Sequence, residues 1–407
     1  MNFSKFEGLN LSVVLIVTIC LFVSVAQFHV AAEELEEIGV QLAEGGDDVY
    51  EFVYGTYLYR VHAFTNVGSN TVTINRNDQL GVLVVGGGGR GGELVSTGVA
   101  GGGGAGGLIW KESYSVSPGN INVEVGDGGT GSNYNSENGE DSSFGALLAL
   151  GGGGGGGDRP WAKDGKDGGS GGGRAYNHTH RPCGPSHGSI GQGLQPTSSS
   201  GGYGNDGGGY GGGGASEPGN GLDGGDGMYF GDKIGTRYGE NGWFAGGGPG
   251  ARYWHSSGLV SGDGGKGGGA TPGPGTPNSG LPTSGGGGLV MFYYYNSSAG
   301  GSGIVVLRYK IPETKNDNYE TNEYKVLSIS SADGVLANDA PIPGKGPLVV
   351  DSINTSGTKG QVSLNPDGSF TYDPNGQFES LDEGETAIDT FIYTARDINL
   401  EINTATV

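Results

Sequence analysis

Four side chains that can bind a transition metal lie within ten residues of one another: His178, His180, Cys183 and His187. Imidazole and thiolate are ligands that zinc prefers, and four of them are enough for a tetrahedral site. Their spacing, H-x-H-x2-C-x3-H, matches no established zinc motif. A polar loop is therefore the favoured interpretation, and zinc is the alternative.

Two glycine-containing patterns formally match motifs of enzymes. Gly86-x-Gly88-x-x-Gly91 follows an apolar strand as a dinucleotide-binding fingerprint does, but more glycine follows where that fingerprint needs a helix. The stretch 168–172 matches the G-x-S-x-G pattern of a nucleophile elbow without a flanking strand or helix. Chance matches are expected in so glycine-rich a chain. We find no paired carboxylates or catalytic triad in a supporting context, and we expect a protein that is not an enzyme.

Composition excludes several classes of protein. The chain has 407 residues, of which 92 are glycine and only 17 proline, with no strict Gly-X-Y period, so collagen is excluded. Its formal net charge is −22. A nucleic-acid-binding protein needs a basic surface to neutralise phosphates, and an acidic chain is repelled by anionic membranes. We therefore expect neither nucleic acid nor a membrane surface as a partner.

The N-terminus reads as an export signal. Lys5 precedes a nearly continuous apolar run, 9–25, and small residues at 30–32 suit signal peptidase. We interpret residues 1–32 as a signal peptide, and an uncleaved membrane anchor is the alternative because the run is long. Either way the bulk of the chain is expected outside the cytoplasm. Cys20 lies in this segment, so an intrachain disulfide with Cys183 is not expected.

Residues 33–48 are acidic and polar, and we interpret them as a linker that contains at most one weak helix. From residue 49 the residue types favour β-strands. Glycine blocks then alternate with short apolar segments up to residue 310, and they include 86–89, 101–104, 151–157, 211–214 and 285–288.

The glycine blocks are either flexible or ordered. Flexibility is the default for glycine-rich sequence, and ordering glycine is costly in backbone entropy. A polyproline-II-like helix has three residues per turn and no internal hydrogen bonds. Without Cβ atoms, several such helices can pack side by side and hydrogen-bond to one another. Tryptophans and apolar segments between the blocks, which a plain linker does not need, favour this ordered arrangement.

Residues from about 57 to 309 resemble the bacterial and phage glycine-rich domain. The stretches that carry the resemblance are 61–65 (VHAFT), 82–89 (VLVVGGGG), 101–107 (GGGGAGG), 118–126 (PGNINVEVG), 141–144 (DSSF) and 300–309 (GGSGIVVLRY). The resemblance implies a β framework that holds polyglycine II helices, with a role in recognition or scaffolding. We assign this domain to 49–310, with a variable insertion at about 158–284.

Residues 315–407 have short alternating segments separated by turn residues, which is typical of a β-sandwich. The segment resembles the cadherin-like tandem repeat of bacterial surface adhesins. The matching stretches are 316–323 (NDNYETNE), 334–339 (GVLAND), 360–362 (GQV), 365–372 (NPDGSFTY) and 389–394 (DTFIYT). We expect an all-β protein, in which a glycine-rich framework precedes an immunoglobulin- or cadherin-like sandwich.

The resemblance also implies a calcium site, since carboxylates near strand junctions bind calcium in this family. The residues at matching positions are Asp317, Glu323, Asn338, Asp339 and Asp397. The stretch 341–346 (PIPGKG) replaces the usual acidic residues. Calcium and plain surface turns therefore both stay open, and no other cofactor is expected.

These observations predict a secreted or cell-surface structural or adhesion protein, in which a glycine-rich scaffold presents binding loops to a protein or glycan. A receptor-binding tip of tail-fibre type is one alternative. A surface hydrolase with its site in the insertion is another, which the sequence does not favour. Membrane contact is expected only through the N-terminal segment, if it stays uncleaved.

Overall fold

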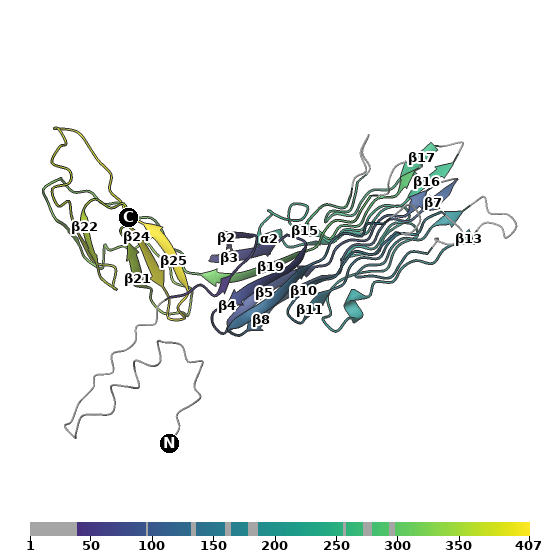
Figure 1. Ribbon diagram of the computed structural model, residues 1–407, viewed down its shortest axis with the longest axis horizontal. Coiled ribbons are helices and arrows are strands. Elements are labelled where there is room, and N and C mark those ends of the chain that lie inside the picture. The colour runs from purple at the N-terminus through teal and green to yellow at the C-terminus, as the bar shows by residue number, and fades with distance from the viewer. Residues whose placement is uncertain are drawn as a thin grey trace, which may run out of the picture. The chain divides into compact units, whose positions relative to one another are not determined.

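The computed structural model describes residues 39–94, 97–131, 136–158, 164–177, 186–254, 258–271, 279–292 and 298–407. The predicted signal segment lies outside these residues. Over the described ranges, no helix is long and apolar enough to cross a membrane. Residues 39–407 form one compact unit, and nearly all of its regular secondary structure is β (Figure 1).

Two five-stranded sheets form the framework of the glycine-rich region. The first has the order β1 (Ala43–Glu44), β4 (Gly68–Ile74), β9 (Gly119–Val125), β10 (Ser142–Phe144), β11 (Leu147–Ala149). The second has the order β2 (Asp48–Tyr54), β3 (Tyr57–Phe64), β19 (Ile304–Ile311), β5 (Asp78–Val85), β8 (Leu108–Val116). All of these pairings are antiparallel.

The second sheet is buried on both faces, which explains its continuous apolar sequences. One face packs on the first sheet through a core that includes Phe64, Val82, Phe144 and Leu307. The other face packs under the rest of the glycine-rich region, with Phe244 among its contacts. Strand β19 lies between β3 and β5 and joins the last residues of the glycine-rich region to the first.

Smaller elements lie away from this framework. A third five-stranded sheet has the order β13 (Ser186–His187), β12 (Tyr176–Asn177), β7 (Gly98–Ala100), β16 (Ala251–Trp254), β17 (Gly258–Ser261). Two pairs join β14 (Met228–Tyr229) to β15 (Trp243–Phe244) and β6 (Glu93–Leu94) to β18 (Met291–Phe292). The described helical turns are η1 (Gln195–Thr197) and α2 (Gly231–Ile234). We call the third sheet the distal sheet, because Figure 1 shows it at the end of the glycine-rich region opposite β4, β5 and β8.

The glycine blocks between these ends hydrogen-bond to one another with a period of three residues. In the run 101–107, the amides of Gly101, Gly104 and Gly107 donate to a single neighbouring run, at Gly156, Gly153 and Leu150 (N···O 2.7 Å each). The two residues between successive donors point to other runs. Three residues per turn is the repeat of a polyproline-II-like helix, so the structure confirms the predicted polyglycine II arrangement.

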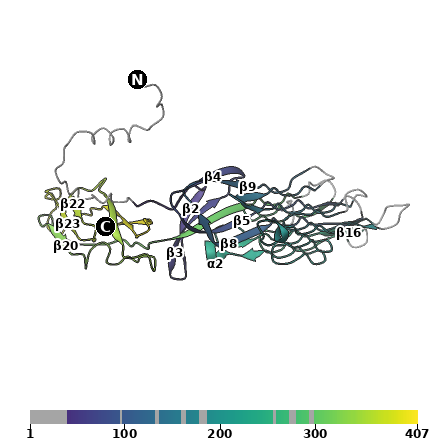
Figure 2. The same ribbon diagram turned by 90° about the horizontal axis from the view of Figure 1, so that it is seen from below.

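Run 101–107 has six neighbouring runs. It donates to three of them, which lie at 150–156, 210–213 and 285–288, and it accepts from three others, at 86–92, 168–173 and around 248. Backbone groups of the run are therefore paired on all sides, as buried amides and carbonyls require. The views in Figures 1 and 2 both show these runs side by side along the length of the glycine-rich region.

Only glycine fits at most positions inside this lattice. A Cβ atom on Gly103 would lie 2.0 Å from the carbonyl oxygen of Gly89. Neighbouring backbones approach where a side chain would otherwise stand, so a methyl group would force two hydrogen-bonded runs apart. The glycine content is thus a steric requirement of the packing.

Carboxylate and amide side chains close the edges of the lattice with the same period of three. The Oδ1 atoms of Asp223 and Asp226 accept hydrogen bonds from the amides of Asp263 and Lys266, at 2.9 and 2.8 Å. Two further pairs repeat the pattern. Asp164 and Asp167 accept hydrogen bonds from the amides of Ser189 and Gln192, and the side chains of Asn138 and Asp141 accept from the amides of Gly154 and Gly151. Side chains at the rim thus replace the missing neighbouring run.

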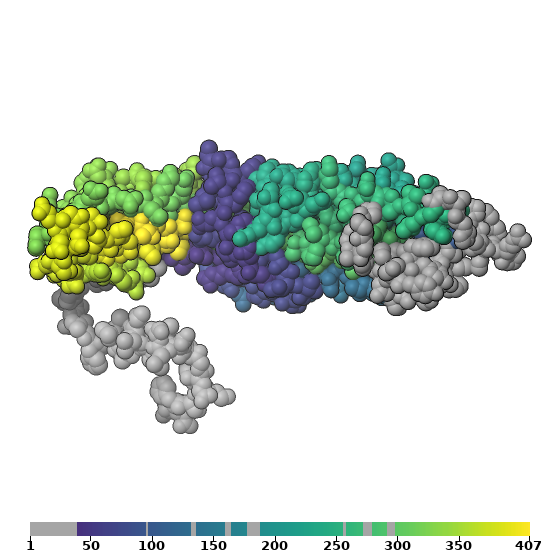
Figure 3. All heavy atoms as spheres, turned by 90° about the horizontal axis from the view of Figure 1, so that it is seen from above, coloured from purple at the N-terminus to yellow at the C-terminus, as the bar shows by residue number. Residues whose placement is uncertain are grey.

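Two segments differ in the structure from what their sequence predicts. Residues 39–48, which we predicted as part of a linker, contain β1, and Leu42 and Ala43 are fully buried in the framework core. Residues within the predicted insertion build the lattice: Gly173 donates to Gly102, and Gly247 to Gly225. The space-filling view shows these teal and green residues covering much of the glycine-rich region (Figure 3).

After residue 312 the chain forms two three-stranded sheets. One has the order β20 (Leu327–Ile329), β23 (Phe370–Asp373), β22 (Gln361–Leu364), and the other β21 (Val349–Asn354), β24 (Ile392–Arg396), β25 (Ile402–Thr406). A core around Phe370, Phe391 and Tyr393 lies between them. The predicted turn at Asn365 is present, since Gly368 donates to its carbonyl oxygen and has a φ of +83°.

Two alanine substitutions test the steric requirement of the lattice. We expect Gly103→Ala to lower the free energy of unfolding by roughly 2 kcal/mol or more, because the added methyl group overpacks a hydrogen-bonded interior. Gly209→Ala is the control: its Cβ would meet nothing closer than 3.6 Å. The midpoint of chemical denaturation measures both variants. An equal fall in the two midpoints would contradict the steric requirement of the lattice.

Candidate functional site

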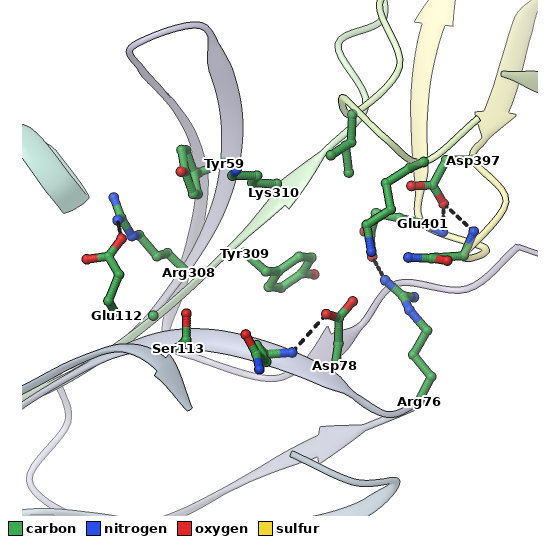
Figure 4. A pocket seen from close by; sticks show the side chains of 15 residues that line it. Tyr59, Arg76, Asp78, Glu112, Ser113, Arg308, Tyr309, Lys310, Asp397 and Glu401 are labelled. Atoms are coloured by element: carbon green, nitrogen blue, oxygen red, sulfur yellow. Dashed lines mark hydrogen bonds and ion pairs between the residues drawn. The ribbon is translucent and has the colours of Figure 1, made fainter. Parts of the chain in front are cut away.

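A cavity lies between the β framework and the C-terminal domain. Its volume is about 380 Å³, and side chains from β3, β5, β8 and β19 line it opposite the residues around 342–345 and 397–401 (Figure 4). Carboxylates and cations occur in equal numbers in its wall: Asp78, Glu112, Asp397 and Glu401, with Arg76, Arg308, Lys310 and Lys345.

Arg308 organises one half of the cavity. The alternation of β19 turns its side chain out of the framework core, and it lies flat over Gly81, where a Cβ atom would meet its Cγ at 2.8 Å. Its guanidinium carbon lies 4.5 Å from the ring centroid of Tyr59 and 5.1 Å from that of Trp110. Cations are attracted to the faces of aromatic rings. The guanidinium group donates to Glu112 Oε1 at 2.5 Å.

Two cations, Arg308 and Lys233, affect the pKa of Glu112. Burial raises the pKa of its carboxyl group. The charges of Arg308 and Lys233 and the hydrogen bonds to the carboxylate lower it by more, so the pKa lies below its usual value. This half of the cavity is thus a closed network, in which the charges satisfy one another.

Glu401 organises the other half. It is 1% exposed and lies between two arginines, Arg76, which pairs with Oε2, and Arg60, whose Nη1 lies 3.8 Å from Oε1. Burial raises the pKa of Glu401 to about 7, although both arginines lower it.

Asp397 also lies in the cavity wall. Its Oδ1 accepts hydrogen bonds from the amides of Asn399 and Glu401, at 2.9 and 3.0 Å, and thereby shapes the turn between β24 and β25. Its Oδ2 is buried and has no hydrogen-bond partner among the described residues. This oxygen can accept a hydrogen bond from water or from a hydroxyl or ammonium group in the cavity.

The structure brings together three of the five predicted calcium ligands. Asn338 Nδ2 donates to Asp317 Oδ1 at 3.0 Å, and Asp339 lies beside them, accepting from Tyr393 at 2.8 Å. Asp397 lies in the cavity wall instead, and Glu323 in the turn before β20. Within the described ranges, no group of three or more His, Cys, Asp or Glu side chains could hold a metal ion.

The predicted zinc ligands lie mostly beyond what the structure describes. His178, His180 and Cys183 are outside the described residues, and only the backbone of His187 is described, in β13. The zinc alternative therefore stays a prediction.

Sequence reasoning missed Arg60, Arg76, Glu401 and the pair Arg308–Glu112. Each lies in a strand or turn where charged residues are common, so no local pattern marks them. Burial sets Arg60, Arg308 and Glu401 apart. For Arg60 and Glu401 it arises from a contact between residues more than 300 positions apart.

The Asp317 cluster predicts how stability depends on pH. Burial, followed by the charge of Asp339, raises the pKa of Asp317 from 3.8 to about 6. Between these values the folded protein binds a proton that the unfolded chain does not, so stability rises as pH falls from 6 to 4. Asp317→Asn should raise the melting temperature at pH 7. It should also reduce the gain in stability that the wild type shows as pH falls from 6 to 4.

Asp367→Asn is the matched control for this change. Hydrogen bonds from Ser369 lower the pKa of Asp367, so its linked loss of stability lies below pH 3.8. Melting temperatures of this variant between pH 4 and 7 should follow the wild type. An equal flattening in both variants would contradict the assignment to Asp317.

Comparison with family models gives two matches. Residues 65–310 match the glycine-rich domain, and residues 310–407 match the bacterial cadherin-like domain. A search of curated proteins finds no match. Bacterial cadherin-like domains are typical of surface or extracellular proteins, and the two domains together are consistent with a surface or structural protein of adhesion type. The chain belongs to the glycine-rich domain family, with a bacterial cadherin-like domain at its C-terminal side.

Proposed function

We propose that this chain is an exported, non-catalytic adhesin, in which the glycine lattice is a stiff support for a binding surface at the distal sheet. The observation that carries the proposal is the lattice itself. Runs that hydrogen-bond to several neighbours cannot bend individually, so the distal sheet is held at a fixed distance from the framework.

The path of the chain supports this arrangement. The glycine-rich region begins at β1 and ends at β19, and both strands belong to the framework. The distal sheet lies at the other end of the region (Figure 1). A domain attached at one end leaves its opposite end free for a partner.

The distal sheet has the residue types of a binding surface. Tyrosine, tryptophan and arginine are enriched in protein interfaces. Strand β16 has the sequence Ala-Arg-Tyr-Trp, and Leu259 on the neighbouring edge strand β17 is 52% exposed. Arg174, close to β12, lies over the ring of Tyr210 at 5.9 Å. These side chains suit a protein or glycan partner better than a small substrate.

The cavity supports a role without catalysis. A catalytic site needs a nucleophile or base held within hydrogen-bond reach of a reacting group and oriented by a third residue. Four of the charged groups of the cavity are engaged in ion pairs, Arg308–Glu112 and Arg76–Glu401.

Adhesion by displayed protein tests this proposal. Non-adherent cells that display the chain should bind at least one of three surfaces: a glycan array, a coat of extracellular-matrix proteins, or a layer of the same chain. The double substitution Arg252→Glu and Leu259→Asp should reduce retention about tenfold or more, because it places new charge on the distal sheet.

Val53→Asp is the matched control. Val53 is also an exposed aliphatic residue, 62% exposed, on β2 at the framework end. It should leave retention unchanged. Cells that bind none of the surfaces would refute the adhesion role, and equal losses in both variants would refute the distal sheet as the binding surface.

A further inference from the structure

We infer that four consecutive residues, Leu400–Asn403, dock the cadherin-like domain rigidly onto the β framework, with Glu401 as the lock. We call these residues the docking segment. They comprise the end of the turn after β24 and the start of β25. The inference does not depend on the adhesion role.

Every residue of the docking segment contacts the glycine-rich region or the residues that lead to and from it. Leu400 O accepts from the amide of Val40 at 3.0 Å. Ile402 O and Asn403 Oδ1 both accept from Arg60, at 3.4 Å. Asn403 also donates to the carbonyl oxygen of Pro312 at 3.0 Å. Four successive residues with such partners form a continuous interface between the two domains.

Glu401 is the centre of the docking segment, because it contacts two arginines from different parts of the framework. Arg60 lies on β3, and Arg76 lies in the turn between β4 and β5. Arg76 also donates to Val40 O at 2.7 Å, so it fixes the incoming chain and the docking segment together. Figure 4 shows Glu401 and Arg76 reaching toward each other from the two domains.

Residue 39 lies so close to side chains of the cadherin-like domain that a glycine fits there best. A Cβ atom on Gly39 would lie 2.2 Å from Cγ2 of Ile402. The Gly39 amide donates to Asp351 Oδ1 at 2.9 Å. Residues 39 and 40 thus lie against the cadherin-like domain before the chain enters the framework.

A second tie lies on the outgoing chain. Glu313 and Ala340 exchange both of their backbone hydrogen bonds, at 3.0 and 2.9 Å. The incoming chain is therefore held at residues 39–40, the framework contacts the docking segment, and the outgoing chain is fixed at residue 313. Contacts at several points restrict rotation, which a single linker would allow.

Charge reversal at the lock tests the inference. Glu401→Lys places a third cation beside Arg60 and Arg76, and removing one partner of a buried ion pair is strongly unfavourable. Hydrogen exchange, followed by mass spectrometry, should show at least about tenfold faster exchange for the amides of Val40 and Ala340. Peptides from β5 and β24 should keep their protection, because the fold of each domain does not need the contact.

Restoring the ion pair between residues 76 and 401 should restore part of the docking, because Arg60 keeps its charge beside residue 401. Arg76→Glu combined with Glu401→Lys reverses both charges, and the double variant should exchange more slowly at Val40 than either single variant. Glu383→Lys, an exposed position in the same domain, is the control and should exchange like the wild type.

Three results would overturn the inference: rapid exchange of Val40 in the wild type, unchanged exchange in Glu401→Lys, or no recovery in the double variant. If Glu401→Lys also loses protection in β24, Arg76→Glu alone decides the question from the framework side. Unchanged exchange at Val40 in that variant counts against the lock.

Discussion

Most of the glycine-rich region depends on one interaction, the hydrogen bond from the amide of one glycine run to a carbonyl of another. A polyproline-II-like run cannot satisfy its own backbone groups, so each run is stable only where neighbours surround it. This constraint explains features that otherwise look unrelated. It requires glycine at positions such as Gly103, where another backbone stands in place of a side chain. It also requires acceptors at the rim, which Asp223 and Asp226 supply. Part of the acidity of the chain thus follows from the lattice.

The periodicity of the glycine blocks predicts the helix type but not the pairing of the runs. Run 101–107 bonds to runs that come before it, shortly after it and far along the chain. All glycine runs look alike locally, so nothing in their sequence specifies a neighbour. The apolar strands resolve this ambiguity. β19 pairs with β3 and β5 in a fixed register, because its Val305 and Leu307 must face one core and Ile304 and Val306 the other. The strands therefore set the positions from which the runs begin.

The C-terminal domain was easier to predict than the contacts that it makes. Its turn residues and alternating strands are local signals, and the two sheets follow them. A site depends on distance, which local signals do not give. The predicted calcium ligands Asp317 and Asp339 do lie together, whereas Asp397 lies in the cavity wall beside Glu401. In the same way, Arg60 reads as an ordinary outward residue of a strand until the second domain covers it.

A lattice that excludes side chains from its interior cannot by itself distinguish one partner from another. Its surface between rims presents backbone, which is the same for any glycine run. Specificity must therefore come from residues between the runs, where side chains have room. The aromatic residues follow this division: Trp110 and Trp243 lie in β8 and β15, and Trp254 in the distal sheet. The first two pack at the framework end, against Phe230 and Tyr229. Trp254 lies in β16, beyond the lattice, where side chains have room for contacts that backbone alone does not offer.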